Sequence, residues 1–204
     1  MAIKFSGKPA IGRIFSAVAF AAIAGFNPGP ATASSDVPDV LFSSFVDEFR
    51  FGVMYNDLHL SRKREEGGVN INAEILFRRP YIYYGNKYLT FFINPRPHLG
   101  GSFNTAGDTS QAYLGLTWDY RLTNNLFTEV ALGGAIHNGQ LNAPGPGPGT
   151  SLGCRVLARG AVSAGYEFTE KIRLMITYTH IGGAGLCNSS SGLSTIGARI
   201  GYKF

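Results

Sequence analysis

Long apolar runs are missing from the sequence beyond its first 33 residues. No later segment approaches the ~18 consecutive apolar residues that a membrane-spanning helix needs, which excludes helical membrane spans. The early run, Ile14–Phe26, has 13 residues and is also too short. It is preceded by basic residues and followed by a small-x-small cleavage pattern, namely Lys4, Lys8, Arg13 and Ala31-Thr32-Ala33. We therefore predict a cleaved signal peptide, residues 1–33, and a single exported domain, residues 34–204.

The exported domain also lacks an excess of charge of one sign. The sequence has 18 basic and 13 acidic residues, and the signal peptide removes three basic residues and no acidic one, which leaves 15 against 13. A protein that binds a nucleic-acid backbone needs clustered excess positive charge. The one basic cluster, Arg62-Lys63-Arg64, is followed at once by Glu65-Glu66. We therefore expect no nucleic-acid partner.

Histidine and cysteine are scarce, with four and two residues. His59, His98 and His137 fall in different segments, and the cysteine spacing matches no metal-ligand pattern. The paired glycines precede no expected helix, so they are not phosphate-binding loops. We therefore expect neither a metal nor a cofactor. Cys154 and Cys187 belong to an exported chain, where such pairs commonly oxidise, so we predict a disulfide, with two free thiols as the alternative.

Alternation of apolar and polar residues is the dominant pattern that is present. Eight segments keep a period of two, as strands with two different faces do. Charged residues, including Glu48, Arg50, Glu129 and Arg173, gather on the opposite faces. Such strands fit a membrane barrel that is apolar outside, or a soluble lipocalin-like carrier that is apolar inside. The apolar faces run over Phe49–Tyr55, Val69–Phe77, Phe91–Leu99, Ala112–Tyr120, Leu126–Ile136, Val156–Phe168, Ile172–His180 and Ser194–Phe204.

Three observations favour the membrane barrel. Aromatic residues fall near the strand ends of the apolar faces, as in the interfacial girdles of membrane barrels. The charged faces carry residues of both signs, and their basic residues are mostly Arg, which suits ion pairing in a narrow lumen. The chain ends on Phe204, which closes an alternating strand and resembles the terminal signature of outer-membrane barrels. We predict an all-β fold, an eight-stranded antiparallel transmembrane β-barrel of the bacterial outer membrane, with a lumen filled by side chains.

The lengths of the connections indicate which side each strand end faces. If the first strand starts in the periplasm, the longer connections are extracellular and the short turns at 122–125 and 169–170 are periplasmic. Cys154 and Cys187 then lie on one side of the membrane, which supports the disulfide. The segment Arg79–Thr90 is long and aromatic for a periplasmic turn, and we interpret it as a strand extension. The four connections predicted to be extracellular are 56–68, 101–110, 137–153 and 183–192.

His180 lies at the extracellular end of the seventh predicted strand, on its apolar face. The residues around it are Tyr178-Thr179-His180-Ile181-Gly182-Gly183-Ala184-Gly185-Leu186, followed by Gly192-Leu193 and the strand Ile196–Phe204. This stretch, together with Leu152–Val156, resembles the lipid A 3-O-deacylases. These are eight-stranded outer-membrane esterases that remove an acyl chain from lipopolysaccharide. The resemblance implies lipid A, or lipopolysaccharide, as a partner, together with outer-membrane lipids.

The family motif reads His-x-Ser-Asn-Ala-Gly, in which Ser is the nucleophile, His its base and Asn an aid to the oxyanion, while a Glu downstream orients the His. His180 and Ala184-Gly185 match this motif, but Gly182 stands at the nucleophile position, Gly183 at the Asn position and Ser194 at the Glu position. Of the nearby serines, Ser194 shares the apolar face of His180, and strand pairing could bring the two together. The other nearby serines are Ser189, Ser190 and Ser191.

The catalytic candidates are therefore His180 as base and Ser194 as nucleophile. Two functions remain open on the sequence. One is a lipid A 3-O-deacylase-like esterase, and the other is a non-catalytic structural or lipopolysaccharide-binding barrel. An attack by water with His180 as base would lack an orienting acid.

Overall fold

The computed structural model describes residues 45–56, 66–79, 82–83, 85–141, 151–185, 187 and 192–204. The predicted signal peptide, residues 1–33, lies outside this described part of the chain, as do Ser189, Ser190 and Ser191.

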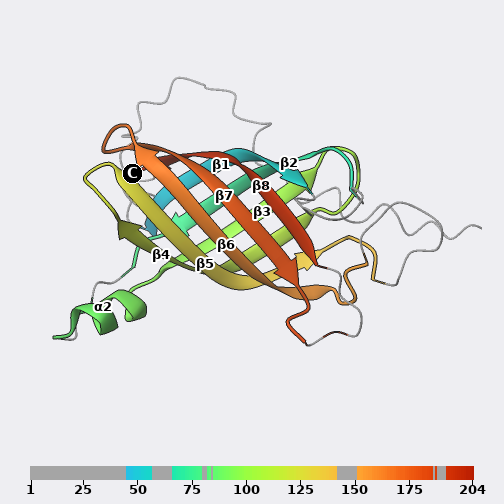
Figure 1. The fold of residues 1–204 in the computed structure, drawn as a ribbon, viewed down its shortest axis with the longest axis horizontal. Coiled ribbons are helices and arrows are strands. Elements are labelled where there is room, and N and C mark those ends of the chain that lie inside the picture. The colour runs from blue at the N-terminus through green and yellow to red at the C-terminus, as the bar shows by residue number, and fades with distance from the viewer. Residues whose placement is uncertain are drawn as a thin grey trace, which may run out of the picture. The chain divides into compact units, whose positions relative to one another are not determined.

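Eight antiparallel strands form one closed barrel (Figure 1). Each strand pairs with its neighbours in the chain, and β1 closes the barrel by pairing with β8. This arrangement confirms the fold predicted from the alternating segments. The strands are β1 (Val46–Asn56), β2 (Val69–Phe77), β3 (Arg96–Asn104), β4 (Gln111–Arg121), β5 (Leu126–His137), β6 (Val156–Glu167), β7 (Ile172–Gly182) and β8 (Leu193–Lys203).

The apolar faces of the strands point outward. Along β7, exposed and buried residues alternate without a break up to Ile181, because successive side chains of a strand point to opposite faces. Ile176 is 62% exposed, whereas its neighbours Met175 and Thr177 are each 1% exposed. The inward faces hold the charged residues. The lipocalin-like alternative, with an apolar interior, is therefore wrong.

Ion pairs fill the lumen toward one end of the barrel. The guanidinium of Arg50 lies 2.8 Å from a Glu48 carboxylate oxygen and 2.6 Å from one of Glu129. Arg173 contacts the same two carboxylates at 2.9 and 3.0 Å. Arg96 adds a third cation to both acids. Each of these five buried charges thus has a partner of opposite sign, which is the condition under which charges are tolerated away from water.

The two ends of the barrel differ in their connections. At one end, which we call the turn end, β4–β5 and β6–β7 are joined by tight turns closed by backbone hydrogen bonds from Leu122 to Leu126 and from Phe168 to Ile172. Strand β8 also ends there, next to the start of β1. The opposite end, which we call the loop end, carries the connections β1–β2, β3–β4, β5–β6 and β7–β8.

The connection from β2 to β3, at the turn end, contains a short helix, α2 (Lys87–Ile93). Asn86 starts the helix, since its side-chain oxygen accepts hydrogen bonds from the backbone N–H groups of Tyr88 and Leu89 at 2.9 and 3.3 Å. The prediction of a strand extension through Arg79–Thr90 and of a strand face starting at Phe91 is therefore wrong. None of the helices in the described ranges is long and apolar enough to cross a membrane.

Strand β3 is also displaced along the chain from its prediction. It begins at Arg96, after Pro95, and runs to Asn104, so residues 101–104 pair with β2 instead of forming part of a loop. Glycine and serine at 100–102 weaken the alternation there, and only the pairing with β2 and β4 defines the strand.

Candidate active site

The hairpin of β7 and β8 brings the two predicted catalytic residues together at the loop end. His180 and Ser194 are direct partners across the two antiparallel strands, so their side chains lie on the same face. Nδ1 of the His180 ring lies 2.9 Å from Oγ of Ser194, within hydrogen-bond distance. A hydroxyl and an imidazole in direct contact are the core of a serine esterase.

Tyr178 is a third member of this cluster. It precedes His180 by two residues on β7, so its side chain lies on the same outward face. Its phenolic O–H donates a hydrogen bond of 2.9 Å to Oγ of Ser194. Strand parity alone predicts this face for Tyr178 but no role, because parity does not identify contacts across strands.

The three side chains differ in their exposure. Ser194 is buried, with 3% of its surface accessible, whereas Tyr178 is 43% exposed and His180 is also exposed. The imidazole therefore lies between the buried Ser194 hydroxyl and the outer surface of the barrel. Among the described residues the structure gives Nε2 of His180 no hydrogen-bond partner.

Two glycines leave room for the His180 ring. A Cβ at Gly182 would lie 3.2 Å from Nε2 of the ring. A Cβ at Gly192 would lie 2.8 Å from Cε1, and the positive φ of 67° at Gly192 also disfavours any other residue. The ring thus has Ser194 on its Nδ1 side and glycine on its Nε2 side.

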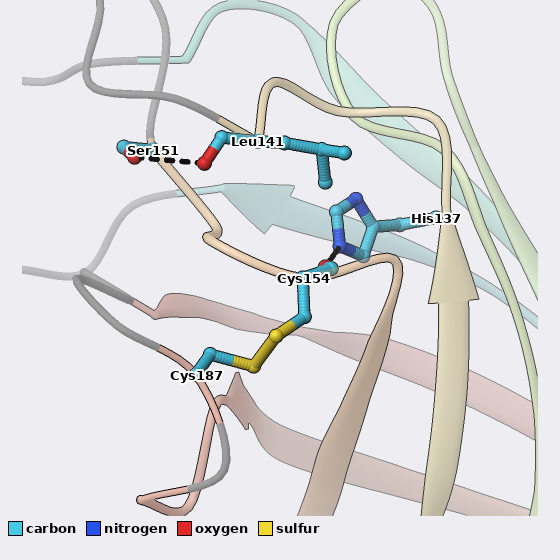
Figure 2. Close-up of a disulfide and its surroundings, with 5 residues drawn as sticks. All are labelled: His137, Leu141, Ser151, Cys154 and Cys187. Carbon is cyan, nitrogen blue, oxygen red and sulfur yellow. Dashed lines mark hydrogen bonds between the residues drawn. A yellow bond between two sulfur atoms is a disulfide. The ribbon is translucent and has the colours of Figure 1, made fainter.

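A disulfide joins the β5–β6 connection to the β7–β8 connection of the hairpin. Cys154, before β6, is bonded to Cys187 in the β7–β8 connection, with 5.9 Å between the Cα atoms (Figure 2). The ring nitrogen Nε2 of His137 lies 2.6 Å from the carbonyl oxygen of Cys154 in the same view. The disulfide packs against a buried apolar cluster that includes Leu152, Ile181 and Leu193. The predicted pairing is confirmed, and it links Cys187, which follows β7, to Cys154.

Within the described part of the chain, no three His, Cys, Asp or Glu side chains come together as metal ligands would.

A family model described as lipid A 3-O-deacylase (PagL) matches residues 82–203, more than half of the chain. The chain belongs to the lipid A 3-O-deacylase family. This membership agrees with the resemblance seen around His180. No curated protein sequence matches the chain.

Solved structures share the fold of this family member. The crystal structure of the outer membrane enzyme PagL is similar with a TM-score of 0.57 and 12% identity, over 77% of this chain and 99% of that chain. The N-terminal β-barrel domain of Pseudomonas aeruginosa OprF is similar with a TM-score of 0.50 and 13% identity, over 79% of this chain and 98% of that one. The family and these neighbours place the barrel in the bacterial outer membrane, as the sequence predicted.

This lipid A 3-O-deacylase family member therefore keeps the histidine of the family motif in a changed setting. Position 182, where the motif has its serine, is a glycine beside Nε2. Position 194, where the motif has its orienting acid, carries the serine that contacts Nδ1. In this chain the hydroxyl thus stands at the position of the acid, on the Nδ1 side of the ring.

Proposed function

We propose that the protein is an esterase of the outer membrane that acts on an acyl ester of lipid A, with Ser194 as nucleophile and His180 as base. The observation that carries this proposal is the 2.9 Å contact between Ser194 Oγ and His180 Nδ1. Bacterial barrels have short periplasmic turns and longer extracellular loops, so the loop end faces outward. The Ser194–His180 pair then faces the outer leaflet, where lipid A resides.

The reaction that this geometry supports is acyl transfer to Ser194. The Ser194 hydroxyl donates its hydrogen bond to Nδ1 of His180, and Nδ1 takes the proton as Oγ attacks the acyl carbonyl. The protonated imidazole then gives the proton to the leaving sugar oxygen, which completes formation of the acyl-enzyme. Water activated by the same nitrogen releases the fatty acid and restores the serine.

Tyr178 has a supporting role in this proposal. Its O–H donates to Oγ of Ser194, so it stabilises negative charge that develops on this oxygen during proton transfer. It also fixes the direction of the serine side chain, because Oγ is held between the phenol and the imidazole. Tyr178 is therefore a positioning residue for the nucleophile.

The second candidate function is a lipopolysaccharide-binding barrel without catalysis. It is favoured by the absence of a side chain at position 182 and by the burial of Ser194, which limits access of an ester to Oγ. In this alternative Ser194 and Tyr178 hold the imidazole in place, and the exposed His180 ring binds the polar part of lipid A.

Mass spectrometry of lipid A separates the two functions. Cells that make the wild-type protein should lose an ester-linked acyl chain from lipid A, whereas cells that make Ser194→Ala or His180→Ala should not. We expect each substitution to lower the rate of fatty-acid release by purified protein about 10³-fold or more. Thr179→Val is the matched control, because Thr179 lies next to His180 but points into the lumen.

Lipid A of unchanged mass in cells that contain folded wild-type protein would contradict the esterase. Folding is checked by heat-modifiable mobility on gels. In that case, if lipid A binds the purified wild-type barrel and binds the His180→Ala variant more weakly, the protein is a lipopolysaccharide-binding barrel and not an esterase.

A further inference from the structure

The connection between β2 and β3 exposes an aromatic surface at the turn end, far from the proposed active site. We call it the aromatic shelf. Tyr88, Tyr83 and Phe92 are 78%, 68% and 66% exposed. An apolar cluster that stands out from the chain in this way marks a contact surface. The shelf consists of Tyr83, Tyr88, Leu89, Phe91, Phe92 and Ile93.

Hydrogen bonds hold the shelf in a defined shape. Asn94 donates from its side-chain amide to the carbonyl oxygens of Ile82 and Thr90 at 2.8 and 2.6 Å, and its side-chain oxygen accepts from the Ile82 N–H at 2.9 Å. Asn86 caps α2 at its other end. The side-chain polar groups of Asn86 and Asn94 are thus used within the segment, while its aromatic side chains are exposed.

The shelf is continuous with the outward apolar band of the barrel. The indole N–H of Trp118, on the outer face of β4, donates a 2.9 Å hydrogen bond to the carbonyl oxygen of Phe92. Tyr120 follows Trp118 by two residues on the outer face of β4 and is 57% exposed. Trp and Tyr concentrate at membrane–water interfaces, where one part of the ring is apolar and another part is polar. The hydrogen bond therefore joins α2 to the interfacial girdle.

The charge of this region also fits a lipid surface. The sequence has no acidic residue between Glu74 and Asp108, whereas Arg78, Arg79 and Lys87 all lie in or beside the β2–β3 connection. Basic side chains next to an apolar helix face are the pattern of helices that lie in a membrane interface. Such helices are attracted to anionic phospholipid headgroups.

We infer that α2 is an interfacial helix whose aromatic shelf enters the periplasmic leaflet of the outer membrane and contacts its phospholipids. Figure 1 shows α2 beyond the strand ends, at the same end of the barrel as the C-terminus. With short turns in the periplasm, this end lies at the inner leaflet. The inference requires only the membrane barrel and does not depend on the esterase.

Site-specific labelling tests the inference in the full-length exported chain. Both native cysteines are in the disulfide, so Tyr88→Cys adds one free thiol for the fluorophore NBD. The matched control is Asn124→Cys, in the short β4–β5 turn at the same end of the barrel. Each labelled protein is refolded into vesicles of phosphatidylcholine and phosphatidylglycerol at 3:1, and folding is checked by heat-modifiable mobility.

Phospholipid with a doxyl group near the headgroup should quench the label at position 88 at least threefold more than the label at 124. Aqueous iodide should show the opposite order. Equal quenching by doxyl lipid at the two positions would overturn the inference. Protection from iodide at position 88 that rises with the protein-to-lipid ratio, without quenching by doxyl lipid, would indicate contact between two copies of the chain and would also overturn it.

Discussion

His180 has two ring nitrogens in different surroundings, and this difference defines the site at the residue scale. Nδ1 contacts the Ser194 hydroxyl, while Nε2 faces the space beside Gly182. In the family motif the serine stands at position 182 and the acid at position 194. The positions of the motif's serine and acid therefore lie on opposite sides of the His180 ring in this chain.

A double substitution that restores the serine and the acid of the family motif should produce a strong esterase. In Gly182→Ser with Ser194→Glu, the new hydroxyl lies beside Nε2 and the new carboxylate beside Nδ1, so both functions of a triad are present. We expect fatty-acid release from lipid A in detergent at a rate at least about 100-fold above wild type. Ser194→Glu alone should be inactive, because it has an orienting acid but no nucleophile. A folded double variant without activity would show that His180 is wrongly placed for this chemistry.

The sequence identified His180 and Ser194 as candidates because motif spacing and strand parity are local properties. Tyr178 and Gly192 were not assigned roles, since each depends on a contact across the hairpin. Gly192 in particular is needed where the chain re-enters β8 beneath the imidazole. Nothing in the single sequence distinguishes it from the glycines of an ordinary loop.

At the scale of elements, the helix α2 shows where a period of two misleads. Apolar residues at 91, 93, 95, 97 and 99 keep one parity, so they are typical of a strand, yet the first two belong to a helix. The Asn86 cap and Pro95 are the local signals that set its limits. Asn86 lies before the alternating pattern, and Pro95 belongs to it but cannot continue the helix. The other strands were predictable because each has one face toward lipid and one toward a charged lumen.

Loss of the disulfide should loosen the loop end without opening the barrel. Cys154→Ser with Cys187→Ser removes the link between two connections, whereas the pairing of β6, β7 and β8 stays intact. We expect the free energy of unfolding to fall by about 2 kcal/mol, at the low end for a native disulfide, because the strands already hold the loops near one another. Added protease should cleave the β7–β8 connection faster in the variant, while heat-modifiable mobility on gels is retained. Cleavage at the wild-type rate would contradict this role.

At the scale of the whole barrel, stability depends on the ion pairs of the lumen. One oxygen of Glu129 contacts Arg50, Arg173 and Arg96 at 2.6, 3.0 and 3.2 Å. We expect Glu129→Gln to lower the free energy of unfolding by about 3 kcal/mol, because it leaves buried cations without full compensation. Urea unfolding in vesicles measures the change.

Arg121→Gln is the control for that substitution. Arg121 pairs with Glu167 at the turn end, but its side chain is 61% exposed, and exposed pairs contribute little. The midpoint of urea unfolding of the Arg121→Gln variant should stay close to that of the wild type. Equal decreases in the free energy of unfolding of the two variants would show that the buried pairs of the lumen stabilise the barrel no more than an exposed pair does.

The site residues all lie on a single hairpin, which makes the proposed chemistry transferable. Tyr178, His180, Gly182, Gly192 and Ser194 fall between the start of β7 and the end of β8, and the hydrogen bonds that join Tyr178, His180 and Ser194 run between these two strands. The remaining six strands serve as a scaffold. A second eight-stranded barrel could therefore receive this hairpin as a module, and the scaffold and the reactive segment could change independently of each other during evolution or design.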